Sequence, residues 1–178
     1  MGDIWDIALY GSFIRGKEDA RDMDIAVLTR KEFSEEKKLS LAQQIKEQLT
    51  NTFPEILFDV MVVDVSDFLN PHFLAREGII AEGYLILKKE YLSKLLGFET
   101  FAYIKYSLQG LTASQKKMLY YALHGRRDMN GVLKEINGQC VSREVLKIPL
   151  QSSYNMEQLL KLHRVSYNME FVMSYNKR

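Results

Sequence analysis

Short apolar runs separated by polar segments make up the first half of the chain, and their spacing predicts a strand-rich domain. The runs at 4–10, 22–28 and 56–64 are rich in β-branched and aromatic residues, and each has the length of a strand. A further short run at 84–88 follows Gly83 and is also predicted to be a strand. We therefore expect four strands before residue 90.

Two helices are predicted between these strands. The first begins after Ser34, a favourable N-cap, and ends near Asn51. Its apolar positions recur at helical spacing at Leu41, Ala42, Ile45 and Leu49. The second is predicted to run from Asn70-Pro71, a cap followed by proline at the first helical position, to Glu82. This order of elements predicts the α+β class, with a small mixed β-sheet and helices on one face of it.

The second half of the chain is predicted to be a helical and αβ region. A helix broken by Gly97 is expected over 89–108, and the capping box Thr112 to Gln115 opens another helix that ends near His124. A strand near 145–148, a helix over 155–162 and a strand over 165–173 follow. We place a domain boundary near residue 90, which gives domains 1–90 and 91–178.

Composition and charge add limits on location and partners. The 178 residues are 47% hydrophobic, enough for a packed core, and carry a formal net charge of +1, which argues mildly against a long nucleic acid as partner. No apolar run is long enough to span a bilayer, so no membrane partner is expected. The single cysteine, Cys140, excludes an internal disulfide and favours a cytoplasmic location. We expect Cys140 to be a small apolar filler.

Three aspartates form the candidate chemistry. Asp22 and Asp24 open the second predicted strand, and Asp59 lies inside the third. Because side chains alternate along a strand, Asp22 and Asp24 project from the same face, about 6–7 Å apart. If the two strands are neighbours, three carboxylates can converge, and their repulsion would raise at least one pKa. Divalent cations relieve such repulsion, so we predict a site for two Mg²⁺ or Mn²⁺ ions.

A glycine-containing loop precedes these aspartates. Gly11-Ser12 follows the first strand, where backbone N–H groups can point at an anion and glycine lets a phosphate approach. Arg15 and Lys17 add cations within reach of a triphosphate. We therefore predict nucleotide binding by Gly11, Ser12, Arg15 and Lys17. A phosphate-binding loop beside metal ligands suits phosphoryl or nucleotidyl transfer.

These motifs, in this order, resemble the minimal nucleotidyltransferase family of the polymerase-β-like superfamily. The residues that carry the resemblance are Gly11-Ser12, Arg15-Gly16, Asp22-x-Asp24 and the later Asp59. The resemblance covers residues 4–88, about half of the chain.

The resemblance implies roles for these residues. Asp22 and Asp24 would bind both metal ions, and Asp59 would bind the ion nearer the acceptor and help activate its hydroxyl. Gly11 and Ser12 would hold the β- and γ-phosphates of an NTP. One departure is Arg21, which stands where relatives commonly have serine and could pair with a carboxylate.

The expected reaction is Mg²⁺-dependent transfer of a nucleoside monophosphate, AMP if ATP is the donor, to a hydroxyl acceptor with release of pyrophosphate. The acceptor is a small molecule or a protein, with a polynucleotide end less favoured. Residues 91–178 would shape the acceptor site or mediate a homodimer. A non-catalytic nucleotide-binding module and an antitoxin-like interaction protein stay open as alternatives.

Four other acidic residues lie in predicted loops or at a strand end, and we expect them at the surface: Glu18, Asp19, Asp64 and Asp67.

Overall fold

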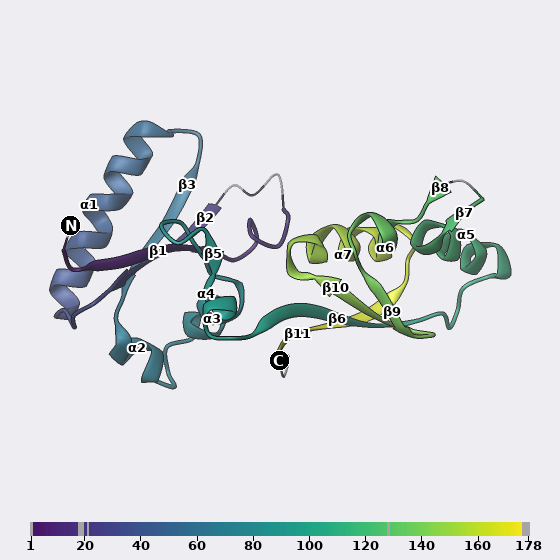
Figure 1. Ribbon diagram of the computed structural model, residues 1–178. Helices are drawn as coiled ribbons and strands as arrows, with labels where there is room; N and C mark the ends of the chain where they lie inside the picture. The colour runs from purple at the N-terminus through teal and green to yellow at the C-terminus, as the bar shows by residue number, and fades with distance from the viewer. Residues whose placement is uncertain (1, 18–19, 21, 128, 176–178) are drawn as a thin grey trace. The chain divides into compact units, whose positions relative to one another are not determined.

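The computed structural model describes residues 2–17, 20, 22–127 and 129–175, and these residues fall into two compact units (Figure 1). The first unit comprises Met1–Glu99 with Tyr175–Arg178, and the second comprises Thr100–Ser174. The expectations for Glu18, Asp19 and Arg21 concern residues outside the described ranges. Among the described residues, no helix has both the length and the apolar character needed to cross a membrane.

A mixed five-stranded sheet forms the centre of the first unit, in the order β3-β2-β1-β4-β5. The strands are β1 (Ile4–Tyr10), β2 (Asp22–Thr29), β3 (Leu57–Val63), β4 (Tyr84–Leu85) and β5 (Glu90–Tyr91). β1 and β2 pair antiparallel across a loop, whereas β2 and β3 pair parallel because a helix connects them. The predicted α+β class and mixed sheet are confirmed.

Helices cover both faces of this sheet, whereas one covered face was predicted. The helices are α1 (Glu35–Thr52), α2 (Val65–Leu69), α3 (Ala75–Glu82) and α4 (Leu92–Leu95). α1 begins after Ser34 as predicted and packs Ile45 and Leu49 against Ile25 and Val27 of β2. The other face of β2 is also apolar: Ala26 and Leu28 pack with Ile79 of α3 and Leu92 of α4. A strand that is apolar on both faces needs cover on both.

A buried ion-pair cluster links α1 to the end of β3. Lys38 Nζ of α1 lies 3.1 Å from Asp64 Oδ2 and 2.8 Å from Asp67 Oδ1, and the side chains of Lys38 and Asp64 are 8% and 1% exposed. Asp64 also caps α2, because its Oδ1 accepts the Ser66 N–H at 2.9 Å. The prediction of a surface position is wrong for Asp64, since capping a helix directly after a core strand places the carboxylate inside.

The Asp64 carboxylate makes the stability of the first unit depend on acid pH. Burial raises the pKa of Asp64. The Ser66 hydroxyl, the Lys38 ammonium and the Phe33 N–H outweigh this effect and lower the pKa to about 2. The unfolded-state pKa is about 3.9, so this stabilisation is complete above about pH 4 and is lost between pH 4 and pH 2. Urea unfolding followed by the fluorescence of Trp5, the single tryptophan, measures it. Asp64→Asn should lose part of this pH dependence; an unchanged profile contradicts the assignment.

The second unit is a four-stranded sheet in the order β11-β6-β10-β9, with helices on one face (Figure 1). Its strands are β6 (Glu99–Ser107), β9 (Gln139–Ser142), β10 (Val145–Pro149) and β11 (Ser166–Ser174), with a separate hairpin of β7 (Gly125–Arg126) and β8 (Met129–Asn130). Its helices are α5 (Ala113–His124), α6 (Val132–Glu135), the 3₁₀ turn η1 (Leu150–Ser152) and α7 (Ser153–Leu162). Ile104 of β6 and Ile148 of β10 pack against Leu123 of α5 and Leu160 of α7.

Three local predictions are wrong. The expected helix over 89–108 is instead β5, α4 and the long strand β6, in which Ala102, Ile104 and Tyr106 are buried on one face. The helix expected from Asn70 begins at Ala75, because the Asn70 side chain accepts the His72 N–H at 3.0 Å and forms a turn. Cys140 is exposed, because β9 is an edge strand, and it is not a core filler.

Candidate functional site

The three predicted aspartates lie on one face at one end of the first sheet. Asp24 of β2 and Asp59 of β3 are direct partners in the parallel ladder, and Asp22 is two residues before Asp24. Directly opposed residues of neighbouring strands project to the same face, as do alternate residues of one strand. Tyr10, at the end of β1, is the partner of Asp24 on the other side. The sheet register thus brings all three carboxylates to the same face.

The carboxylates repel one another and affect the groups around them. Burial, followed by the charges of Asp22 and Asp59, raises the pKa of Asp24, and the nearby Arg15 guanidinium opposes this rise. Burial and the charges of Asp24 and Asp59 likewise raise the pKa of the Tyr10 hydroxyl. Among the described residues, no donor hydrogen-bonds the three carboxylates. This end of the sheet is therefore an anionic centre that a cation would stabilise.

These residues fit a divalent cation, although they do not enclose one by themselves. Within the described ranges, no group of three His, Cys, Asp or Glu side chains is gathered closely enough to hold a metal ion. Mg²⁺ commonly binds through only one or two carboxylates and completes its shell with water and substrate phosphate. The adjacent Asp24 and Asp59 supply two hard oxygen ligands of that kind. Substrate oxygens would supply the remaining ligands.

The loop after β1 packs directly against Asp24. Gly11 has φ +78°, in the left-handed region, and a β-carbon added there would overlap Asp24 Oδ2. The loop then makes a helical turn, in which the Arg15 and Lys17 N–H groups donate to the Gly11 and Ser12 carbonyls at 3.3 and 3.2 Å. The N–H groups at the start of this turn, those of Ser12, Phe13 and Ile14, donate to no acceptor among the described residues. They are available to an anion.

Glu82, at the end of α3, binds this loop, and it was not among the residues predicted from the sequence. Glu82 is 5% exposed, and its Oε2 accepts the Gly11 N–H at 3.1 Å. The Arg15 guanidinium donates to Glu82 Oε1 at 2.9 Å and to Oε2 at 3.1 Å. One signal was present in the sequence: a carboxylate in the last turn of a helix opposes the helix dipole, so it needs a compensating cation.

A comparison with protein-family models matches residues 2–91 to the family described as Polymerase beta, Nucleotidyltransferase. The match spans half of the chain. The chain belongs to this nucleotidyltransferase family. The family predicted from the sequence is therefore confirmed. Comparisons with curated proteins and with solved structures found no match.

The nucleotidyltransferase domain places some of the predicted site residues at one end of the sheet, whereas the Arg15 side chain binds Glu82. Asp22, Asp24 and Asp59 lie on one face at the same end of the sheet, and Gly11 packs against Asp24. Arg15 is turned toward Glu82, so in this conformation part of its guanidinium is already bound. Ser12 offers a backbone N–H at the start of the turn. The Lys17 side chain makes no ion pair with a described residue.

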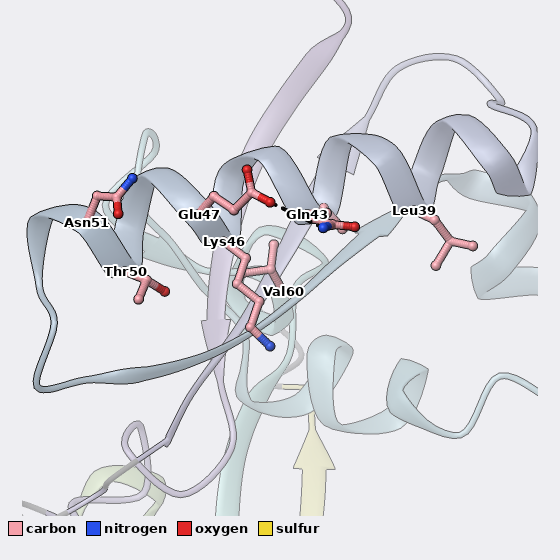
Figure 2. Close-up of a pocket in the computed structure, with 8 residues that line it drawn as sticks. Leu39, Gln43, Lys46, Glu47, Thr50, Asn51 and Val60 are labelled. Carbon is pink, nitrogen blue, oxygen red and sulfur yellow. Dashed lines mark hydrogen bonds between the residues drawn. The ribbon is translucent and has the colours of Figure 1, made fainter.

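A hollow of about 910 Å³ lies elsewhere in the nucleotidyltransferase domain, between α1 and the edge strand β3 (Figure 2). Figure 2 shows Lys46 and Glu47 of α1 together with Val60 of β3 in its wall. Val60 packs on the α1 face of the sheet, whereas its neighbour Asp59 projects from the opposite face. This hollow is therefore not part of the carboxylate site.

Gly11→Ala is expected to destabilise the nucleotidyltransferase domain by about 2 kcal/mol or more. The left-handed backbone alone costs a non-glycine residue about 1–2 kcal/mol, and the new methyl group must also displace the Asp24 carboxylate. Urea unfolding followed by Trp5 fluorescence measures the cost. Gly97→Ala is the matched control, because Gly97 has φ +86° and no atom within 4 Å of an added β-carbon. Equal costs for the two variants would contradict close packing between Gly11 and Asp24.

Proposed function

We propose that this chain is an NTP-dependent nucleotidyltransferase that moves a nucleoside monophosphate, such as AMP from ATP, to a hydroxyl acceptor and releases pyrophosphate. The observation that supports it best is the placement of Asp24 and Asp59 as direct ladder partners beside the Gly11 loop. Membership of the nucleotidyltransferase family supports this class of reaction. We also propose a cytoplasmic location, on the basis of the single, unpaired cysteine.

Each residue of the site has a proposed role. Asp22, Asp24 and Asp59 would hold two Mg²⁺ or Mn²⁺ ions, which when bound would neutralise the triphosphate and the departing pyrophosphate. Asp59 would also accept a hydrogen bond from the acceptor hydroxyl and orient it. The N–H groups at the start of the Gly11 loop would hold the β- and γ-phosphates, with Lys17 adding charge. Arg15 would reach the phosphates once it exchanges Glu82 for them.

The second unit would recognise the acceptor or join two copies of the chain. A small molecule or a protein is the proposed acceptor, because the chain as a whole is nearly neutral, with a formal net charge of +1. Labelling identifies the acceptor directly.

Labelling with α-³²P-NTPs tests the proposed function. The chain is incubated with Mg²⁺, each of the four NTPs in turn, and fractionated cell extract. We expect pyrophosphate release and transfer of label to one fraction, which identifies the acceptor. NTP binding without release would instead support a non-catalytic nucleotide-binding module. Neither binding nor transfer, together with a stable protein complex, would overturn the enzyme in favour of an interaction protein.

Metal binding can be tested without activity. Because a ligand that binds only the folded state stabilises it, millimolar Mg²⁺ or Mn²⁺ with a non-hydrolysable NTP should raise the melting temperature of the first unit. Asp59→Asn should remove most of this rise, while Asp3→Asn, a change in an exposed ion pair, should keep it. An equal rise in both variants would contradict the metal assignment.

A further inference from the structure

The near-neutral charge of the chain is the sum of two unequal parts. Thr100–Ser174 contains ten Lys and Arg against five Asp and Glu, a formal net charge of +5. The rest of the chain contains fourteen basic and eighteen acidic residues, a formal net charge of −4. The balance of the whole sequence therefore hides a basic unit. A basic unit attracts anionic ligands, and their binding weakens with added salt.

A cavity of about 480 Å³ concentrates part of this charge in the second unit. Lys116 and Lys117 of α5 line it, together with Arg143 from the turn between β9 and β10, and none of its lining residues is acidic. Its apolar wall includes Leu119 and Leu123 of α5. This volume lies within the range of ordinary small-ligand pockets, about 300–1,000 Å³.

The cations of this cavity are not neutralised by the described part of the protein. Lys116, Lys117 and Arg143 form no ion pair with a described carboxylate, whereas Lys161 of the same unit lies 2.8 Å from Glu157. The nearest acidic neighbour in sequence is Glu144, whose Oε1 accepts the Leu108 N–H at 3.4 Å. Leu108 lines the cavity, so one carboxylate lies at its wall against the three cations Lys116, Lys117 and Arg143, and the positive charge is in excess.

The cavity also has aromatic groups, and a hydrogen bond anchors the turn in its wall. Tyr120 is 58% exposed, and its ring centroid lies 4.6 Å from that of His124 at an interplanar angle of 36°. The Tyr106 hydroxyl donates to the Arg143 carbonyl at 3.0 Å, and this bond anchors the turn that carries Arg143 to β6. Flat aromatic surfaces beside cations are the combination on which a base and its phosphate can both bind.

We propose that this cavity binds a nucleotide unit, with the phosphate held by Lys116, Lys117 and Arg143 and the base packed on Tyr120. The unit is either a free nucleotide or the end of a single strand, since both present the same base and phosphate. The site does not involve Asp22, Asp24 or Asp59, and the proposal does not depend on the transferase assignment.

The test measures binding of two probes to the full chain, AMP and a 5′-phosphorylated ten-nucleotide oligoadenylate. A chelator is present, so that metal-dependent binding at the aspartate site does not contribute. Arg143→Gln should weaken binding of both probes about tenfold, because a hydrogen-bonded phosphate contact is lost. Lys134→Gln is the matched control: Lys134 is an exposed cation of α6 outside the cavity, and its removal should change affinity less than twofold.

A separate variant tests whether the base packs on Tyr120. Tyr120→Ala should weaken binding of AMP about tenfold and leave binding of inorganic phosphate unchanged, because phosphate has no base to stack. Asp24→Asn should bind both probes as the unchanged chain does. That result would keep this proposal even if the transferase assignment failed.

The outcomes distinguish a free nucleotide from a strand end, and they define the results that would overturn the proposal. Tighter binding of AMP than of the oligoadenylate identifies a free nucleotide. Binding of the oligoadenylate that is at least as tight as that of AMP, and more salt-dependent, identifies a strand end. The proposal is overturned if the chain binds neither probe at millimolar concentration, or if Arg143→Gln and Tyr120→Ala leave binding unchanged. An equal loss in Lys134→Gln and Arg143→Gln would also overturn it, because it would show attraction to the basic unit as a whole.

Discussion

Asp24→Asn is expected to lower the rate of pyrophosphate release by at least about 10³-fold while leaving the domain folded. The lost carboxylate would hold metal in the proposed reaction, and metal contributes several kcal/mol of charge stabilisation, with each 1.4 kcal/mol equal to a tenfold change in rate. Pyrophosphate release and the melting temperature are measured on the same preparation. Stability should stay level or rise, because the substitution removes a charge whose burial, together with repulsion from Asp22 and Asp59, raises the pKa of Asp24.

The combination of these two readouts makes the result specific. Glu36→Gln, which removes an exposed carboxylate from the first turn of α1, is the control and should leave the rate unchanged. If Asp24→Asn unfolds the domain, the aspartate is structural and the proposed role is wrong. If Asp24→Asn keeps its activity, the metal assignment is wrong as well.

Lys38→Met is expected to destabilise the first unit by about 3 kcal/mol, the largest effect on stability that we predict. The substitution leaves the Asp64 carboxylate, 1% exposed, without its cation, and breaking a buried ion pair from one side costs about 3–5 kcal/mol. For a unit of about 100 residues this corresponds to a fall of about 10 °C or more in melting temperature. Urea unfolding followed by Trp5 fluorescence measures the change.

Two further variants distinguish a buried pair from a general effect of lost charge. Lys46→Met, on the exposed part of α1, should change stability by no more than about 0.5 kcal/mol. Adding Asp64→Asn to Lys38→Met should recover part of the loss, since the stranded charge is removed. A double variant less stable than Lys38→Met would contradict this account.

Much of the local structure could be predicted because it depends on neighbours in the chain. Ser34 caps α1, and the box of Thr112 and Gln115 opens α5, because these contacts span only three residues. The prediction of a helix over 89–108 was wrong for the opposite reason. Its aromatic and β-branched residues gain more from pairing in β6 with β10, about forty residues later, than from a local helix.

The candidate site also combines features that follow from a single strand with contacts that depend on distant segments. Alternation along β2 placed Asp22 and Asp24 on one face, and this follows from the strand alone. The neighbour of Asp24 could only be assumed, and the parallel register with β3 makes it Asp59. The contact of Glu82 with Arg15 joins residues 67 positions apart, so no short pattern contains it.

The sequence by itself determined the types and order of the chemical groups: a glycine turn, then paired aspartates, then a lone aspartate in a later strand, and with them the family. Only the tertiary structure decided which groups meet. It set Asp24 beside Asp59, turned Arg15 to Glu82, buried Asp64 against Lys38 and gathered the uncompensated cations of the second unit around one cavity. The physical reason is the distance along the chain over which each interaction acts. Propensities and caps act within a few residues, whereas register, burial and charge compensation depend on which distant segments pack together.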